Sequence, residues 1–262
     1  MEENIIENKP IINKNEGQKQ LAGAIIIAGV LIAGAILLKP NAPSNNNPGN
    51  GLAVSSLAPI SKNDRILGNP KAKVALVLYE DFQCPFCGAV SGLSGENTDA
   101  VKYLKSKVPS WAPFMPVVND YVKNGTVELV YRDFVFLGPE SIRAAEAARC
   151  AGEQGKFWEY HDYLYGHQGG ENKGAFSDAN LKIFAKNFSV GTDFLIDGKA
   201  FDNCLDTGKY AQAVNDEKDA GSNAGVTGTP KAFILKDGRI FATIEGAEPA
   251  SSVKQKLDNA LK

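Results

Sequence analysis

The sequence predicts an α/β fold in which two parallel strands and a later β-hairpin are separated by an all-helical insertion. Residues 73–80 are apolar on both faces over the length of a strand, and residues 126–136 are rich in β-branched and aromatic side chains. Residues 139–225 instead repeat apolar side chains at spacings of three and four. The expected order is therefore strand, helix, strand, helical insertion, hairpin and last helix.

The N-terminal part of the chain is expected to anchor the domain in a membrane. Residues 21–38 contain no charge and no proline, and as a helix they extend about 27 Å at roughly 1.5 Å per residue, nearly the width of a bilayer core. The small-residue pattern Ala33-Gly34-Ala35 lies inside this run, which favours an uncleaved signal anchor over a cleaved signal peptide. More lysines precede the run than follow it, so residues 1–20 are expected to be a cytoplasmic tail.

Residues 39–64 are expected to form a flexible linker. They are rich in Asn, Pro and Ser and show little apolar periodicity. A coil of about 25 residues reaches on the order of 25 to 30 Å. The sequence thus predicts a single-pass membrane protein whose folded domain, residues 65–262, lies on the extracytoplasmic side.

The first folded elements surround a pair of cysteines. The turn at residues 68–71 leads into the central strand at 73–80. Pro85 follows Cys84, and a proline is favoured in the first turn of a helix because its missing N–H needs no partner there. A helix is therefore expected to begin within the motif. The glycines and prolines of residues 91–113 exclude one long helix, so this segment is expected to be an irregular excursion.

The remaining elements follow from composition and turn residues. Residues 115–125 predict a short helix, and the strand at 126–136 then implies a parallel, right-handed crossover. After the helical insertion, residues 231–246 predict a hairpin around Gly238, and residues 249–262 predict the terminal helix.

Charge and cysteine content limit the possible functions. The formal net charge of −2 provides no basic excess for neutralising phosphates, so nucleic acid is not expected as a partner. Four cysteines are too few for a disulfide-dense small protein and enough for two bridges.

The spacing of Cys84 and Cys87 indicates redox chemistry. A cysteine at a helix N-terminus faces free N–H groups and the positive end of the helix dipole, which favour the thiolate. Cys84 is therefore expected to be the accessible nucleophile, and Cys87, one turn later, is placed to attack a mixed disulfide formed on Cys84. A structural zinc site needs four ligands, and Cys150 and Cys204 do not form a second pair with this spacing. A redox centre is favoured over a metal site, and no metal or cofactor is expected.

These motifs together resemble the DsbA-like branch of the thioredoxin superfamily. The resemblance rests on residues 68–87, on residues 225–230 with Thr229-Pro230, and on helical stretches around Cys150 and Cys204. It implies a thioredoxin-like fold whose helical insertion, at about residues 139–225, lies between the second strand and the cis-proline loop.

The resemblance also implies roles for individual residues. Pro230 would be the cis-proline beside the active-site disulfide, and Thr229 would offer its backbone to an extended substrate segment. Cys150 and Cys204 would form a buried structural disulfide, with two free buried thiols as the alternative.

Two carboxylates end the central strand just before the motif. A carboxylate at Glu80 or Asp81 is a candidate for moving the proton of Cys87, although such residues are more often solvated at a strand end. The two histidines, His161 and His167, are six residues apart and share no helix face, which indicates packing or surface roles.

The expected function is that of a membrane-tethered, monomeric thiol:disulfide oxidoreductase that introduces disulfides into reduced exported proteins. The resemblance implies reoxidation by a quinone-linked membrane partner of the DsbB or VKOR type. Strongly oxidising relatives carry CPHC, and Phe86 stands here in place of the histidine. An isomerase, a reductase and a non-catalytic binding domain with the same scaffold therefore stay open as alternatives.

Overall fold

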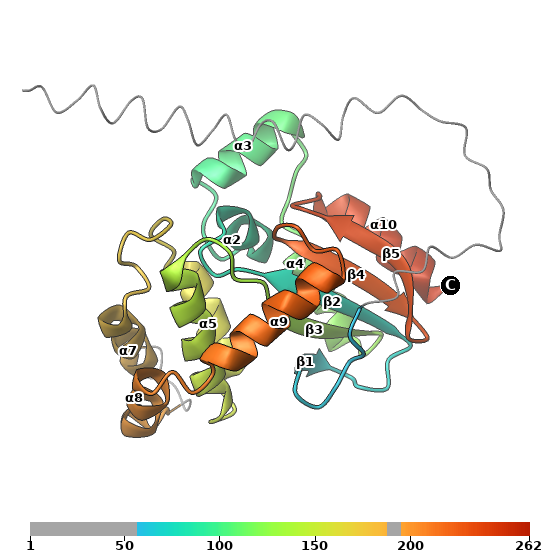
Figure 1. The fold of residues 1–262 in the computed structure, drawn as a ribbon. Helices are drawn as coiled ribbons and strands as arrows, with labels where there is room; N and C mark the ends of the chain where they lie inside the picture. The colour runs from blue at the N-terminus through green and yellow to red at the C-terminus, as the bar shows by residue number, and fades with distance from the viewer. Residues whose placement is uncertain (1–56, 188–194) are drawn as a thin grey trace, which may run out of the picture. The chain divides into compact units, whose positions relative to one another are not determined.

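The computed structural model describes residues 57–187 and 195–262, which belong to one compact unit (Figure 1). The expected cytoplasmic tail, the expected membrane anchor at 21–38 and most of the expected linker lie outside the described residues. Among the helices of the described part, none is long and apolar enough to cross a membrane.

The strands form one five-stranded sheet in the order β1-β3-β2-β4-β5. Strands β2 and β3 are parallel, whereas β4 is antiparallel to β2, β5 to β4, and β1 to β3. The parallel crossover and the hairpin are thereby confirmed, and β1 is an edge strand that the sequence analysis missed. The strands are β1 (Arg65–Gly68), β2 (Val74–Glu80), β3 (Val127–Asp133), β4 (Lys231–Lys236) and β5 (Arg239–Glu245).

The helices divide between the sheet and the insertion, as the periodicity predicted. Those near the sheet are α2 (Pro85–Ser91), α3 (Asp99–Lys107), α4 (Met115–Lys123) and α10 (Ala250–Leu261). Those of the insertion are α5 (Pro139–Gly152), α6 (Phe157–Gly166), α7 (Asp178–Asn187), α8 (Gly198–Asp206) and α9 (Ala211–Asn223).

Both faces of the sheet are covered. Apolar residues of β2, β3 and β4 pack on one face against α2, α4 and α10, and helix α9 crosses the other face (Figure 1). The insertion has its own core between α5, α6 and α8, which extends to Phe82 and to both motif cysteines. The cysteine motif therefore lies where the core of the insertion meets the sheet.

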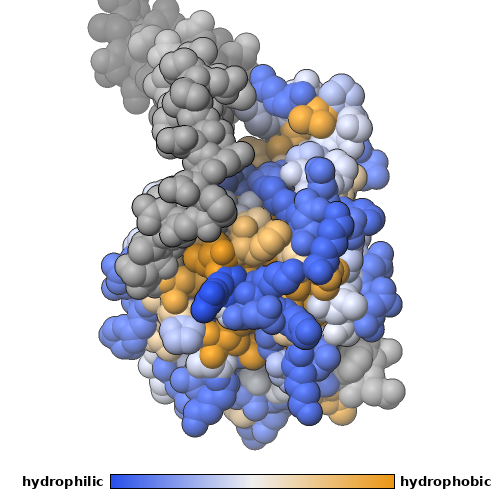
Figure 2. Space-filling model, turned by 90° about the vertical axis from the view of Figure 1, so that its right-hand side faces the viewer, coloured by the Kyte–Doolittle hydropathy of each residue, from blue (hydrophilic) through white to orange (hydrophobic). Residues whose placement is uncertain are grey.

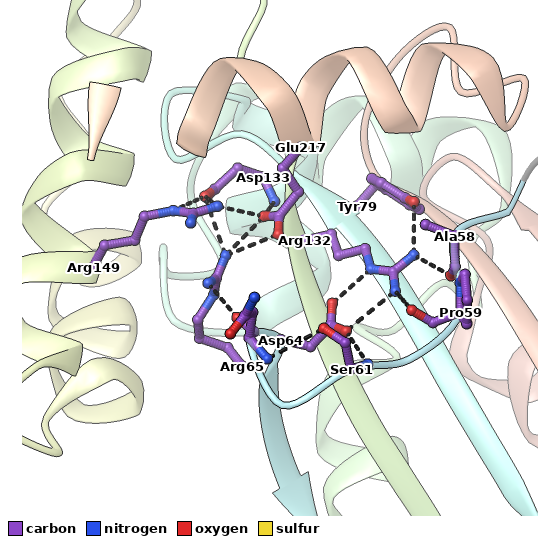
Figure 3. Close-up of polar contacts among 11 residues, drawn as sticks. Ala58, Pro59, Ser61, Asp64, Arg65, Tyr79, Arg132, Asp133, Arg149 and Glu217 are labelled. Atoms are coloured by element: carbon purple, nitrogen blue, oxygen red, sulfur yellow. Dashed lines mark hydrogen bonds and ion pairs between the residues drawn. The ribbon is translucent and has the colours of Figure 1, made fainter. Parts of the chain in front are cut away.

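The segment just before β1 is held against the domain, so the expectation of a flexible linker was wrong for residues 57–64. The Arg132 side chain, 4% exposed, donates to the carbonyl oxygens of Ala58 and Pro59 at 2.9 and 3.1 Å and pairs with Asp64 at 2.8 Å (Figure 3). Leu57 packs against the sheet core. A buried guanidinium needs such partners, because leaving one unpaired costs several kcal/mol, on the order of 3–5.

A second buried ionic cluster ties the insertion to the sheet. Arg149 of α5 binds Asp133 of β3 at 2.7 Å and Glu217 of α9 at 2.8 Å (Figure 3). Arg65 of β1 reaches the same Glu217 carboxylate at 2.8 Å. Two strands of the sheet, β1 and β3, are thus joined to two helices of the insertion, α5 and α9.

The expected irregular excursion at residues 91–113 contains the helix α3. Thr98 caps this helix by accepting a hydrogen bond from the Val101 N–H, and Asp99 follows in its first turn. Lys105 and Lys107 lie in its last turn, where positive charge favours the helix dipole. The glycines and prolines of this segment exclude one long helix, as expected, but they leave room for the short helix α3.

The face of the domain on the side of β5 and α10 is mixed in character. Figure 2 shows hydrophilic side chains over much of it, with apolar patches between them. Phe241 of β5 is 47% exposed, and the Lys236 ammonium lies 5.9 Å from its ring centre. A lysine beside an exposed edge strand is a common protection against unwanted strand pairing.

Candidate active site

The cysteine motif lies where β2 ends and α2 begins. Cys84 is the N-cap of α2, Pro85 occupies the first helical position, and the Gly88 N–H donates to the Cys84 carbonyl oxygen at 3.1 Å. Cys84 and Cys87 are both free thiols in the structure. The sequence therefore places the first sulfur at a helix N-terminus, as the motif predicted.

The loop before β4 meets the motif at the first cysteine. Cys84 Sγ lies 3.4 Å from the carbonyl oxygen of Thr229, and the Thr229-Pro230 peptide bond is cis. Pro230 is buried, whereas Thr229 is half-buried. Residues 145 positions apart are thus brought together at one sulfur.

Cys84 is less accessible than the sequence analysis expected. It is only 3% exposed, because the Thr229-Pro230 loop lies against its sulfur, and Cys87 is 0% exposed. Pro85, the next residue, is exposed. The Cys84 sulfur therefore lies just beneath the surface, and a partner must approach it past the exposed Pro85 and the half-buried Thr229.

The pKa values of the two thiols are shifted in opposite directions. A hydrogen bond with Cys87 is the main cause that lowers the pKa of Cys84, and the Thr229 side chain and the N–H groups of Phe86 and Cys87 act in the same direction against burial. Burial raises the pKa of Cys87 well above its ordinary value, and the charges of Cys84 and Glu80 add to this effect. Cys84 is therefore the thiol that ionises first.

Of the two candidate carboxylates, only Glu80 remains available as a proton acceptor. Asp81 is 0% exposed, and its oxygens accept hydrogen bonds from the N–H groups of Gln83, Phe136 and Leu137, so it holds the loops that follow β2 and β3. Glu80 is 1% exposed, and its Oε1 has no hydrogen-bond partner among the described residues. Burial raises the pKa of Glu80.

His161 of α6 is a site residue that the sequence analysis treated as packing. Its Nε2 lies 3.6 Å from Glu80 Oε2 and its Nδ1 lies 2.9 Å from Asp162 Oδ1. Burial alone would lower the pKa of His161, but the hydrogen bond with Asp162 and the nearby Glu80 carboxylate outweigh burial and raise it. The long separation from Glu80 in the chain hid this contact.

The loop after α6 holds the motif through a glutamine that no sequence pattern indicated. Gln168 Nε2 donates to the carbonyl oxygens of Phe82 and Cys84 at 2.7 and 3.0 Å. A Cβ at Gly88 would lie 2.0 Å from Gln168 Oε1, so only glycine leaves room for this amide. Gln83 is bound to the same loop, since its Oε1 accepts a hydrogen bond from the Asn172 N–H.

The other two cysteines lie within the helical insertion. Cys150 of α5 and Cys204 of α8 are bonded to each other with an S–S distance of 2.01 Å, and both are buried. Their bridge closes 54 residues of chain.

Residues 57–187 and 195–262 were searched for a metal site and for hollows. In the part of the chain that is described, no group of three or more His, Cys, Asp or Glu side chains is placed to hold a metal ion. Two open hollows of about 350 and 380 Å³ lie at the opposite end of β2, where Lys71 and Lys73 line both.

A comparison with protein families agrees with this geometry. The model of a family described as thioredoxin matches residues 61–103 and 112–258. The interruption between the two matched stretches falls in the segment that contains the end of α3.

Curated relatives share part of the chain. A Na(+)/H(+) antiporter NhaA 1 of Salinispora arenicola is 28% identical over 174 residues, which are 65% of this chain and 21% of the antiporter. A putative protein-disulfide oxidoreductase of Rickettsia felis is 23% identical over 176 residues, 67% of this chain and 54% of that protein. The chain thus matches about a fifth of the antiporter's length and about half of the second relative.

Solved structures share the fold. BdbD of Bacillus subtilis, in its oxidised form, has a TM-score of 0.59 and 20% identity, and covers 79% of this chain and 97% of its own. The α-DsbA1 protein of Wolbachia pipientis has a TM-score of 0.59 and 19% identity, with 80% and 96% covered. Both structures therefore share the fold of this chain over most of its length.

Proposed function

We propose that this chain, which belongs to the thioredoxin family and has the DsbA-like form of its fold, is a thiol:disulfide oxidoreductase that acts through Cys84 and Cys87. The observation that supports this most strongly is the Cys84 thiol at the start of α2, with its sulfur 3.4 Å from the Thr229 carbonyl oxygen. A helix N-terminus favours the thiolate, and the thiolate is the species that exchanges with disulfides.

The reaction proceeds through a mixed disulfide. A substrate thiolate attacks Cys84 Sγ in the Cys84–Cys87 disulfide, and Cys87 leaves as a thiolate that takes up a proton. A second substrate thiolate then attacks the substrate sulfur bound to Cys84, and Cys84 leaves as a thiolate. Two electrons pass to the enzyme and the substrate keeps the new disulfide. Glu80 supplies the proton to Cys87, and Thr229 aligns the substrate backbone.

The preferred direction is oxidation of the substrate. The low pKa of Cys84 stabilises the reduced enzyme, which makes its disulfide a stronger oxidant. A reductase or an isomerase is the second candidate, because Phe86 brings no positive charge to the motif, unlike a histidine at that position. A scaffold that binds without exchange is the remaining alternative.

The proposed setting is the extracytoplasmic side of a membrane. The apolar run at residues 21–38 supports a tether, and a structural disulfide between Cys150 and Cys204 suits an oxidising compartment. The substrates are then reduced exported proteins, met by a monomer. A quinone-linked membrane protein of the DsbB or VKOR type completes the cycle by accepting the two electrons. No cofactor beyond the cysteine pair and no metal takes part.

The redox potential of the Cys84–Cys87 pair tests the direction. Equilibration with glutathione buffers, followed by mass spectrometry of the trapped thiols, gives the potential. A value nearer about −120 mV supports the oxidase, and one near about −270 mV supports the reductase.

The ability to oxidise a reduced, unfolded protein tests the activity itself. Wild-type protein is expected to restore disulfides in such a substrate, and a Cys84→Ser variant is the control without the nucleophile. A Cys87→Ala variant is expected to accumulate mixed disulfides on Cys84. A wild-type pair that exchanges with neither glutathione nor the substrate would leave the non-catalytic scaffold as the function.

A further inference from the structure

We infer that His161 and Asp162 extend the proposed role of Glu80 into a proton route that connects the buried Cys87 thiol with solvent. The inference rests on the proposed function, because Cys87 changes its protonation only when the pair exchanges. His161 and Asp162 belong to α6, in the insertion, and therefore reach the motif from outside the strand–helix unit that carries the cysteines.

Cys87 needs such a route because no solvent reaches it. Its side chain is 0% exposed, and Cys84, the sulfur nearest the surface, is itself 3% exposed. Each catalytic cycle nevertheless protonates and deprotonates Cys87 once. A positioned acid or base close to the thiol is the usual way in which proteins move such a proton.

The three side chains form a continuous path outward. Cys87 is buried in the same core cluster as Phe82, Tyr131 and Tyr165, whose rings surround His161, and the charge of Glu80 helps to raise the pKa of Cys87. Glu80 Oε2 lies 3.6 Å from His161 Nε2, and His161 Nδ1 lies 2.9 Å from Asp162 Oδ1. The exposed fraction of the side chain rises along this path, from 2% at Glu80 through 6% at His161 to 62% at Asp162.

Aromatic rings fix the imidazole in place. The rings of Tyr131, Phe82 and Tyr165 lie edge-on to it, with centre distances of 5.2, 5.6 and 4.9 Å. The titratable groups that face His161 are Glu80 from β2, Tyr131 from β3, and Asp162 and Tyr165 from its own helix. The ring therefore presents one nitrogen to Glu80 and the other to Asp162.

The proton moves inward when Cys87 leaves as a thiolate. Glu80 gives its proton to Cys87, His161 gives the Nε2 proton to Glu80, and Asp162 gives a proton taken from solvent to His161 Nδ1. When the enzyme is reoxidised, Cys87 loses its proton to Glu80 and the transfers run outward. The two halves of the cycle thus return His161 to its original tautomer.

The test separates the two steps by which glutathione disulfide oxidises the reduced protein. Cys84 first forms a mixed disulfide with glutathione, and Cys87 then closes the intramolecular disulfide. Rapid acid quenching and mass spectrometry follow both species between pH 5 and 9. The first step alone is measured in a Cys87→Ala background. The variants are His161→Gln and Asp162→Asn, and His167→Gln is the matched control. In the described part of the chain, the contacts of His167 are with the Tyr163 carbonyl oxygen and with the rings of Tyr163 and Phe184.

If His161 and Asp162 relay the proton, their substitution slows the second step, the closure of the Cys84–Cys87 disulfide, and leaves the first step unchanged. We expect a loss of about tenfold in His161→Gln and about threefold in Asp162→Asn at pH 7, below the roughly hundredfold of a group that itself accepts the proton. His161 lowers the pKa of Glu80, so its removal also shifts the pH profile of the second step upward. His167→Gln is expected to behave as wild type.

Each other result overturns the relay. If the second step keeps its rate and pH profile in both variants, protons reach Cys87 by another path. If Asp162→Asn, a substitution of an exposed side chain, slows both steps by the same factor, the cause is structural damage. If the wild-type protein forms no mixed disulfide at all, the proposed function fails and the relay fails with it.

Discussion

The two cysteine pairs of this chain are similarly buried, but they differ in where their cysteines lie along the helices. Cys84 is 3% exposed and Cys204 is 4% exposed, so access to solvent does not distinguish them. Cys84 begins α2, whereas Cys150 and Cys204 lie two residues before the ends of α5 and α8. The helix dipole favours a thiolate at the first position and disfavours one at the other two.

The position of a cysteine along its helix therefore distinguishes the thiol that is expected to exchange, Cys84, from the two cysteines of the structural bridge. A leaving thiolate near the C-terminal end of a helix is disfavoured by the helix dipole, so the Cys150–Cys204 bridge is expected to resist exchange. The Cys84 thiol has a lowered pKa and lies beside the half-buried Thr229, where a partner can approach. Substitutions at and around the two cysteine pairs test this comparison.

The largest expected effect comes from removing one pair at a time. Cys84→Ser is expected to abolish disulfide exchange while the protein stays folded. The double variant Cys150→Ala, Cys204→Ala is expected to keep exchange and to lose about 4 kcal/mol of unfolding free energy, as the chain-entropy model gives for a loop of this length. Urea unfolding and glutathione exchange measure the two quantities. A folded double variant without exchange would contradict the separation of roles.

An intermediate effect is expected at Gly88. The Cβ of Gly88→Ala would displace the Gln168 amide, which binds the Phe82 and Cys84 carbonyl oxygens. Such overpacking costs about 1–3 kcal/mol of unfolding free energy. Gly166→Ala is the matched control, because nothing lies within 4 Å of a Cβ there.

A double-mutant cycle checks that Gln168 is the cause. In a Gln168→Ala background, Gly88→Ala is expected to cost less than half as much as in the wild type, since the clash is gone. Equal costs in both backgrounds would show that the glycine is needed for another reason.

The smallest effect is expected at the rim of the motif. The Tyr103 ring of α3 lies 6.1 Å from Phe86, in an edge-on contact, and Tyr103 is 38% exposed. Such a pair contributes about 0.5–1.5 kcal/mol, so Tyr103→Ala is expected to lower kcat/KM for a protein substrate about threefold and to leave glutathione exchange unchanged. Phe241→Ala, at an exposed aromatic residue of β5, is the control. An equal loss with glutathione would mean that α3 affects the motif and not the substrate.

The sequence predicted the elements that carry strong local signals. The apolar run of β2, the proline after Cys84 and the helical periodicity of the insertion gave the strand, the helix start and the order of elements. It missed β1, because four residues at a sheet edge show no pattern apart from their pairing with β3. It also missed α3, where only Ala100 and Val101 are buried and the apolar face is short.

The candidate site was predicted where its residues are adjacent in the chain and missed where they are not. Cys84 and Cys87 follow from their spacing alone. The contacts of His161 with Glu80 and of Gln168 with Cys84 join residues more than 80 positions apart, and nothing in their local sequence announces them. The burial of Cys84 was missed for the same reason, since it depends on the distant Thr229 loop.

The central claim is that the hydrogen bond with Cys87 and the N–H groups at the start of α2 together make Cys84 the acidic thiol of the pair. Its lowered pKa means that the folded protein loses this proton at a lower pH than the unfolded chain. The reduced protein should therefore gain stability as pH rises through the folded-state pKa of Cys84, up to about 8.5, the ordinary value for a thiol. Below the folded-state pKa this contribution is lost, and Cys84→Ser should lack it.

The most direct test is the pH dependence of alkylation by iodoacetamide, with the modified site identified by mass spectrometry. The account predicts that Cys84 alone is modified and that its rate reaches half of its maximum at a pH below the midpoint of the same cysteine in the urea-unfolded chain. Modification of Cys87 first, or a midpoint for Cys84 at or above that of the unfolded chain, would contradict it.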